Sequence, residues 1–303
     1  MAFELEVVLI NNKMKKIVGI KNYVLLYSVL FVCTIQAQTL NVSDTANIKL
    51  DLTYGIASGE ELKMDISVPE GKGPFPVCIL VHGGGFTKGD KQKQSKHLFK
   101  PLSDAGYAWV SINYRLAPTF KYPSSVEDLE TAIRWVKAHV AEYRFDRSRI
   151  VLIGESAGGY LVNMVGAKSQ KDTRVAAVVS LYGASDLLSR LNSSDGKPSY
   201  NFSTYFGVTG DNEATRKFLV EASPATYIRP GLPPFLLLHG NKDETVPYEQ
   251  SVNFLAKLKA ANVPAELITI EGGIHGMSAW NKINSNYAAQ LVKWLKLTLE
   301  SKH

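Results

Sequence analysis

The run Gly154-Glu155-Ser156-Ala157-Gly158-Gly159 sets the architecture of this chain. The apolar, β-branched run Arg149–Ile153 precedes it and predicts a buried parallel strand. The apolar run Tyr160–Val165 follows it and predicts a helix. Because each glycine costs a helix about 1 kcal/mol relative to alanine, the glycines here indicate a geometric need. In a G-x-S-x-G turn between strand and helix, larger side chains two residues from the serine would collide. The pattern therefore predicts that Ser156 is held up at a helix N-terminus.

Composition limits the classes of protein to which the chain can belong. Its 303 residues are 45% hydrophobic and 20% charged, which suits one large α/β domain or two small ones. The net charge is +6, but the basic residues are spread out and are not interleaved with aromatic residues, so we expect no nucleic-acid partner. The two cysteines are Cys33 and Cys78, and an internal disulfide in a processed chain is not expected.

The first 37 residues are typical of a targeting segment. Four lysines between positions 13 and 21 precede the apolar run 23–35, and Gln36-Ala37-Gln38 offers a small residue for cleavage. The apolar run has 13 residues, fewer than the roughly 20 that a membrane-spanning helix needs. We expect a signal peptide over 1–37, a catalytic domain over 38–303, a secreted or periplasmic location, and no stable membrane insertion after cleavage. An uncleaved N-terminal anchor is the alternative.

Buried strands and helices alternate along most of the chain. The expected strands are Ile48–Tyr54, Leu62–Val68, Pro76–Val81, Ala108–Tyr114, Ile150–Gly154, Val175–Leu181, Pro234–His239 and Glu266–Ile270. The expected helices are Lys93–Ala105, Ser124–Tyr143, Ala157–Ala167, Tyr248–Ala261 and Asn284–Ser301. Continuous apolar strands in such an alternation predict an α/β protein with a mostly parallel, eight-stranded sheet covered by helices on both faces.

The segment 183–232 interrupts this alternation, just before the penultimate strand. It is polar and turn-rich, and it carries aromatic residues at Tyr200, Phe202, Tyr205 and Phe206. Loops of this length inside a domain are usually functional. We therefore interpret it as a small cap or a substrate-binding insertion.

A serine nucleophile requires a base and an orienting acid, which the sequence offers in the expected chain order. His275 lies in the glycine-flanked loop Gly272–Gly276 after the last strand, where an imidazole can reach into a site. His239 ends a strand and is an alternative base or a structural residue. Asp243 follows that strand and is the candidate acid, with its neighbour Glu244 as the alternative.

The run His82-Gly83-Gly84-Gly85-Phe86 supplies backbone that can approach a substrate closely. Its N–H groups, together with that of Ala157, are candidates to stabilise an oxyanion. A phosphate-binding loop is disfavoured because no Lys-Ser/Thr pair follows. We found no metal-ligand cluster and no G-x-G-x-x-G motif, so we expect neither a metal nor another cofactor.

Several motifs together resemble one family. They are His82–Phe86, Asn113–Pro118, Tyr122-Pro123, Glu127-Asp128, Ile133–Trp135 and Gly154–Gly159. This set resembles the α/β-hydrolase esterases of the hormone-sensitive-lipase-like group, and in particular secreted carbohydrate esterases of the acetyl-xylan and feruloyl type. The likeness runs from about Leu62 to Leu297. It implies an α/β-hydrolase fold, a Ser156–His275–Asp243 triad, and Gly84, Gly85 and Ala157 as oxyanion donors. The family often has Asp where this chain has Glu155.

The resemblance implies a secreted serine carboxylic-ester hydrolase. We expect short-chain or aromatic acyl esters as substrates, either small molecules or acetyl or feruloyl groups on plant xylan. Phe86, Tyr205, Phe206 and Trp280 are the candidate substrate contacts. The alternatives are a peptidase of the prolyl-oligopeptidase type, a broad short-chain carboxylesterase without a carbohydrate role, and a binding module that has lost catalysis. The sequence leaves the oligomeric state open.

Overall fold

The apolar runs of the sequence assemble into one eight-stranded sheet in the computed structural model, which describes residues 48–93 and 95–300. The strands are β1 (Ile48–Ala57), β2 (Glu60–Ser67), β3 (Phe75–Val81), β4 (Ala108–Ile112), β5 (Phe145–Glu155), β6 (Ala177–Leu181), β7 (Phe235–Gly240) and β8 (Ala265–Ile270). Their order in the sheet is β1-β2-β4-β3-β5-β6-β7-β8.

The sheet is parallel except at one edge. β1 and β2 form an antiparallel hairpin, β2 pairs antiparallel with β4, and every other neighbouring pair is parallel. The central strands β3, β4, β6 and β7 are almost wholly buried, which explains their unbroken apolar sequences. The predicted fold class, a mostly parallel eight-stranded sheet with helices on both faces, is confirmed.

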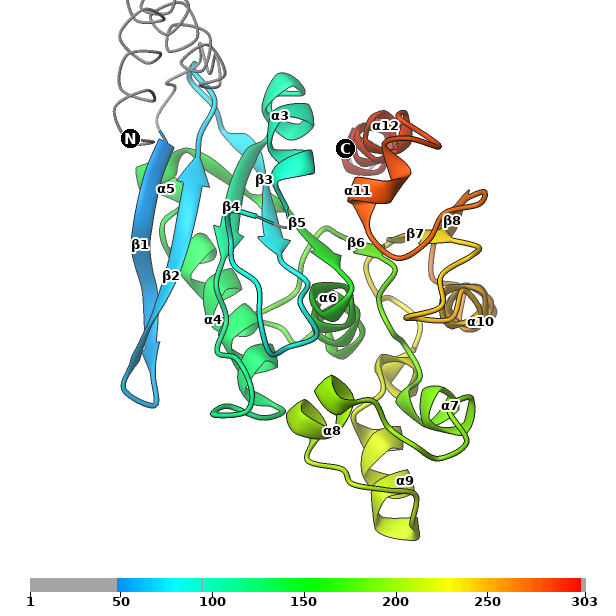
Figure 1. The fold of residues 1–303 in the computed structure, drawn as a ribbon. Coiled ribbons are helices and arrows are strands. Elements are labelled where there is room, and N and C mark those ends of the chain that lie inside the picture. The colour runs from blue at the N-terminus through cyan, green and yellow to red at the C-terminus, as the bar shows by residue number, and fades with distance from the viewer. Residues whose placement is uncertain (1–47, 94, 301–303) are drawn as a thin grey trace, which may run out of the picture. The chain divides into compact units, whose positions relative to one another are not determined.

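Helices cover both faces of this sheet (Figure 1). One face packs against α3 (Lys96–Asp104) and α12 (Tyr287–Glu300), whose buried leucines join one apolar cluster. The other face packs against α4 (Ser124–Ala138), α6 (Ala157–Lys168) and α10 (Glu249–Ala260), which share a second cluster. The carboxyl ends of the parallel strands are thereby left free to carry the loops of a site.

One expected helix is divided in two. The run 124–143 forms α4 and the short helix α5 (Val140–Tyr143), with a break at His139, where φ is −108° and ψ is 22°. The His139 ring stacks on Trp135 at 3.9 Å between centroids, and its Nδ1 lies 2.8 Å from the Trp135 carbonyl oxygen. A local side-chain contact of this kind competes with helix continuation.

The helix expected from Lys93 begins later, at Lys96. The Asp90 carboxylate accepts hydrogen bonds from the backbone N–H groups of Gln92 and Lys93, which holds that segment as a turn. The last helix likewise begins at Tyr287 and not at Asn284, because the Asn284 side chain accepts from the N–H of Asn286.

The insertion 183–232 is helical, which its polar sequence did not indicate. It holds α7 (Leu187–Asn192), α8 (Tyr200–Phe206), α9 (Glu213–Glu221) and the 3₁₀ helix η2 (Pro224–Tyr227). Asp186 and Asn212 cap α7 and α9 by accepting N–H groups three residues on. Figure 1 shows these helices gathered at the bottom of the view, below α6 and α10.

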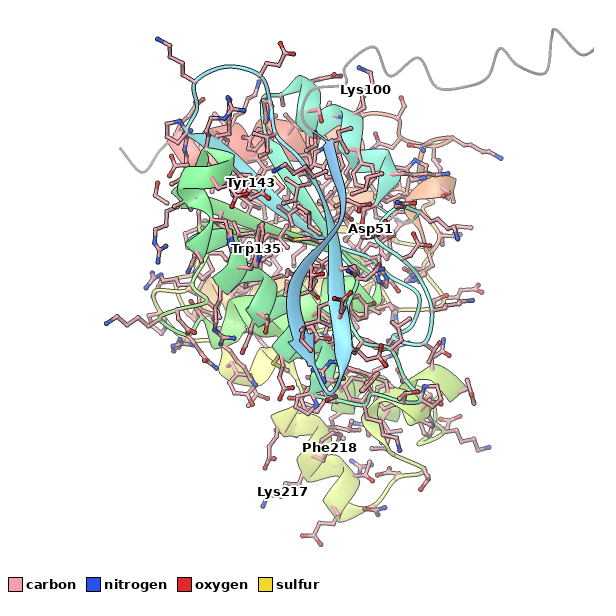
Figure 2. All side chains as sticks on the ribbon, turned by 90° about the vertical axis from the view of Figure 1, so that its left-hand side faces the viewer. Asp51, Lys100, Trp135, Tyr143, Lys217 and Phe218 are labelled. Carbon is pink, nitrogen blue, oxygen red and sulfur yellow. The ribbon has the colours of Figure 1, made fainter. Side chains whose placement is uncertain are left out.

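A buried ion pair fixes the edge hairpin to the segment that follows the glycine-rich run. The ammonium of Lys91 lies 2.8 Å from carboxylate oxygens of both Asp51 and Asp65, and its side chain is only 5% exposed. Figure 2, which faces the hairpin, shows Asp51 on it and Lys217 of α9 at the far lower end. A lysine buried this deeply requires such partners, so hairpin and loop are held together.

The predicted signal peptide, residues 1–37, lies outside the described residues. Among the helices of 48–93 and 95–300, none combines the length and the apolar character that crossing a bilayer requires.

Candidate active site

Ser156 occupies the sharp turn between β5 and α6. Its backbone has φ 52° and ψ −112°, a strained conformation for a residue with a side chain. The two flanking glycines make the turn possible: a Cβ on Gly154 would meet the backbone of Gly158, and one on Gly158 would meet the carbonyl of Val81. The sequence-predicted turn is therefore present, and it holds the serine hydroxyl at the start of α6.

Ser156, His275 and Asp243 form a continuous chain of hydrogen bonds. The serine Oγ lies 2.8 Å from Nε2 of His275, and Nδ1 of that ring lies 2.6 Å from Oδ2 of Asp243. Because the carboxylate can only accept, Nδ1 carries a proton, and Nε2 of the neutral ring is left to accept from the serine hydroxyl. The structure thus brings together the three residues that the sequence analysis selected.

The carboxylate of Asp243 is held rigidly in the loop after β7. Its Oδ1 accepts the N–H groups of Thr245 and Val246, each at 2.9 Å. Burial by itself would raise the pKa of Asp243, but hydrogen bonds from His239 and His275 outweigh that effect and hold the pKa well below its usual range. Its neighbour Glu244 is exposed, and within the described residues the carboxylate that His275 contacts is that of Asp243, so the alternative acid is not supported.

His239, the alternative base, is fully buried and makes different contacts. Its Nδ1 lies 2.7 Å from Oγ of Ser251, and its Nε2 lies 2.9 Å from the Val246 carbonyl oxygen and 3.3 Å from Oδ2 of Asp243. Since a carbonyl only accepts, Nε2 carries the proton and donates toward both oxygens. His239 therefore supports Asp243 and does not reach Ser156.

The glycine-rich run lies against the serine. Within the described part of the chain, the N–H groups of Gly84, Gly85 and Ala157 have no hydrogen-bond acceptor, and all three residues line the same cavity as Ser156. Gly84 has φ +103°, and a Cβ there would meet the carbonyl of Lys88, so only glycine fits. The arrangement leaves backbone donors available beside the hydroxyl, as an oxyanion site requires.

His82 braces this run from within. Its ring stacks on Tyr114 at 4.2 Å, and its Nδ1 donates to the Gly83 carbonyl at 2.7 Å. Burial lowers the pKa of His82 to about 4, so the ring is neutral near pH 7. His82 is thus a structural residue of this run.

Glu155 and Tyr182 connect the turn to the catalytic histidine. The Tyr182 hydroxyl donates to a carboxyl oxygen of Glu155, and the Tyr182 ring meets His275 edge-on at 4.8 Å. Burial raises the pKa of Glu155, opposed by the Tyr182 hydroxyl and the Gly83 N–H. The sequence analysis did not select Tyr182. Its position directly after β6, at the carboxyl edge of the sheet, was the available signal.

A cavity of about 610 Å³ opens at Ser156. Two of the four predicted substrate contacts, Phe86 and Phe206, line it. The other two predictions are wrong. Tyr205 is fully buried and stacks on Phe86 at 4.0 Å, behind the cavity wall. Trp280 is also fully buried, with its indole N–H on the Ile274 carbonyl at 2.7 Å. These contacts hold both rings in the core, and neither lines the cavity.

Other residues of the insertion also line the cavity, among them Phe202, one of the aromatic residues that the sequence analysis singled out. Leu187 and Arg190 from α7 and Asn201 from α8 line it as well and were not predicted. Asn201 accepts a hydrogen bond from the hydroxyl of Thr87 at 3.2 Å, which ties the insertion to the glycine-rich run. Within residues 48–93 and 95–300, no group of three or more His, Cys, Asp or Glu residues is placed to hold a metal ion.

The sequence and the fold of this chain are similar to those of several proteins described as esterases. The chain is 34% identical over 197 residues to the probable carboxylic ester hydrolase LipM of Mycobacterium tuberculosis, covering 62% of this chain and 46% of LipM. The chain spans about half the length of the curated relatives it matches. A truncated carbohydrate esterase from gut microbiota superimposes with a TM-score of 0.76 at 24% identity, over 86% of this chain and 99% of that one.

A second solved structure, the bifunctional GH43-CE protein of Bacteroides eggerthii, superimposes with a TM-score of 0.72 at 28% identity. The match covers 83% of this chain and 38% of that protein. The resemblance to α/β-hydrolase esterases that the motifs suggested is therefore confirmed. The BD-FAE family matches residues 64–258, which is more than half of the sequence, and the chain belongs to this family of α/β-hydrolases.

Proposed function

We propose that this chain is a serine carboxylic-ester hydrolase that works through an acyl-enzyme. The observation that carries the proposal is the hydrogen-bonded chain from Ser156 through His275 to Asp243, beside unpaired N–H groups of the described residues. The similarity to LipM supports the reaction class.

Acylation starts when Ser156 Oγ attacks the ester carbonyl carbon while Nε2 of His275 takes the hydroxyl proton. The negative charge moves to the carbonyl oxygen, which the N–H groups of Ala157 and the glycine-rich run stabilise. The imidazolium is stabilised by the carboxylate of Asp243. The tetrahedral intermediate collapses, the bond to the alcohol oxygen breaks, and His275 gives its proton to the departing alcohol.

Deacylation repeats these steps with water. His275 removes a proton from a water molecule, whose oxygen attacks the acyl carbon, and Ser156 leaves as the proton returns to its Oγ. The product is a carboxylic acid, and the enzyme regains its starting state. The balance needs no group other than water and this chain's own residues.

The acyl group that we propose is short or aromatic. The cavity wall near Ser156 carries Phe86, Phe202 and Phe206, which suit a small apolar or phenolic acyl group. Each methylene contributes about 0.8 kcal/mol only where apolar surface covers it. An ester on polysaccharide, such as acetyl or feruloyl xylan, is proposed because the sequence motifs resemble those of carbohydrate esterases.

The function is tested with Ser156→Ala, in which alanine fits the turn and only the nucleophile is lost. We expect no measurable hydrolysis of 4-nitrophenyl acetate, unchanged circular dichroism, and phosphonate labelling of the wild type at Ser156 alone. A variant retaining a tenth of wild-type activity would contradict the proposal.

Substrate class is tested separately, with a 4-nitrophenyl ester series and with acylated xylan. We expect acetyl to butyryl esters to be hydrolysed far faster than octanoyl esters, and release of acetate or ferulate from xylan. A maximum at eight carbons or more contradicts the short-acyl proposal. Activity on the small esters without release from xylan favours a broad carboxylesterase, and cleavage of prolyl peptides favours the peptidase.

Export is also proposed, on the basis of the basic and apolar segments within residues 1–37. Mass spectrometry of the exported protein should find Gln38 or a near neighbour as the N-terminus. Recovery of the intact leader in the membrane fraction would favour an anchor.

A further inference from the structure

A second hollow of about 240 Å³ adjoins the cavity at Ser156. The two hollows share Arg190, Ser199, Phe202, Glu244 and Thr245 in their walls, so the smaller one continues the larger. Half of the remaining lining residues are polar, namely Ser193, Ser194 and Lys197 of the insertion, and the others are Leu191, Pro198 and Pro247. The polar side chains in its wall, Arg190 and Lys197 among them, can contact a polar extension of a substrate whose ester lies at Ser156.

Arg190 stands at the junction of the two hollows. Its Nη2 donates to the Thr245 carbonyl at 3.1 Å, and its guanidinium carbon lies 5.9 Å from the centre of the Phe202 ring. A guanidinium offers five N–H donors, and no carboxylate in the described residues forms an ion pair with this one. Arg115 and Arg216, by contrast, each pair with a carboxylate.

The charges around Arg190 favour an anionic ligand. Burial lowers the pKa of Arg190, and the nearby negative charge of Asp243 opposes this, so the cation is partly removed from water. Lys88 lines the first hollow and Lys197 the second. The carboxyl groups in the walls are those of Glu244, which is exposed and lines both hollows, and of Glu155, which lines the first and accepts from Tyr182. A cation that is partly removed from water and lacks a carboxylate gains most from a ligand that supplies one.

We propose that the second hollow binds a carboxylate carried by the ester substrate, held by Arg190 with Lys197. The serines of the wall would accept and donate hydrogen bonds to sugar hydroxyls, so the expected source is a uronic acid on an acylated oligosaccharide. This inference rests on the proposed ester hydrolysis and assigns the insertion a role in selecting acidic substrates.

The test compares kcat/KM within matched pairs of esters, using the full chain. One pair is acetylated xylo-oligosaccharide with and without a glucuronic acid branch. The other pair is mono-4-nitrophenyl adipate and 4-nitrophenyl hexanoate, which places the carboxylate on the acyl side. The variants are Arg190→Gln, Arg190→Lys and Lys197→Gln. Arg216→Gln is the control, because it removes the same charge from an exposed site of the insertion outside both hollows.

We expect the wild type to favour the acidic sugar by about tenfold, the strength of one hydrogen-bonded charge pair. Arg190→Gln should abolish this ratio, Arg190→Lys and Lys197→Gln should reduce it, and Arg216→Gln should keep it. A preference confined to the adipate pair would support the carboxylate site and place it on the acyl side. Because the ratio is internal to each preparation, partial unfolding of a variant does not alter it.

Two results would overturn the inference. The first is an equal kcat/KM within both pairs for the wild type. The second is a preference that Arg190→Gln preserves while both rates fall together, because that is the effect of a residue that only supports the Asp243 loop. If no ester is hydrolysed, the proposed function fails, and an NMR titration with methyl glucuronoside then decides the subsite. Binding by the wild type and not by Arg190→Gln supports it, and equal binding contradicts it.

Discussion

Strand β7 and the loop after β8 each present a histidine to the same carboxylate oxygen, Oδ2 of Asp243. His239, at the end of β7, has no exposed surface, and both of its ring nitrogens meet fixed groups of the protein. His275, in the loop after β8, has a side chain that is 22% exposed, and its second nitrogen meets the hydroxyl of Ser156. Contact with the acid therefore does not identify a base. The base is identified by what its other ring nitrogen contacts, which is the Ser156 hydroxyl for His275.

The largest effect should come from His275→Ala, which removes the ring between hydroxyl and carboxylate. We expect kcat for ester hydrolysis to fall about a million-fold, as for other members of such triads, with little change in the urea midpoint of unfolding. Steady-state kinetics and urea titration measure both. Substantial residual activity would mean that another group acts as base.

The second largest loss of activity is expected for Asp243→Asn. Its kcat should fall about ten thousand-fold, since an amide favours the wrong tautomer of His275. The folded-state pKa of Asp243 lies below its unfolded value, so its carboxylate stabilises the fold above about pH 4, and this stability fades as the pH falls further. In the Asp243→Asn variant that pH dependence should weaken, which urea unfolding between pH 3 and pH 7 measures. If the variant keeps wild-type kinetics, Asp243 takes no part in catalysis.

His239→Ala should have the opposite balance of effects to His275→Ala, with a large loss of stability and a small loss of activity. Loss of a buried ring and of one donor to Asp243 should lower the free energy of unfolding by about 3 kcal/mol, while kcat falls only about tenfold, the value of one charge-assisted hydrogen bond. Urea unfolding and kinetics on the same preparation check the contrast. Equal losses of activity in the two histidine variants would contradict the assignment of His275 as the base and of His239 as a supporting residue.

The smallest expected effect is a change in the free energy of unfolding, and it concerns Glu155, the residue before Ser156. Because burial raises its pKa, the fold favours the neutral carboxyl, and stability is full below about pH 4 and declines as the pH rises through the raised pKa. Glu155→Gln cannot ionise and still accepts from Tyr182. It should therefore be more stable than the wild type at pH 8, by about 1.4 kcal/mol for each unit by which the pKa is raised. The difference should shrink at pH 4, which thermal unfolding at both values measures.

The roles of residues that depend on local chain geometry could be predicted from the sequence. The turn at Ser156 was predicted because glycines on either side relieve its collisions, and His275 because glycines flank it in the loop after the last strand. The apolar strand runs likewise predicted a parallel sheet, since only burial on both faces tolerates them. The helix break at His139 was missed because it depends on one ring stacking on another.

Residues whose role depends on which distant segments meet could be placed only from the folded molecule. Tyr205 and Trp280 were expected at the substrate and are in the core, whereas Arg190 and Tyr182 line the cavity without having been selected. The amino-acid sequence was sufficient for the sheet, the serine turn and the order of serine, acid and histidine, because these follow from steric and apolar patterns along neighbouring residues. Which aromatic and basic side chains face the cavity depends instead on how the insertion packs against the glycine-rich run, because a side chain's surroundings are set by segments far away in the chain.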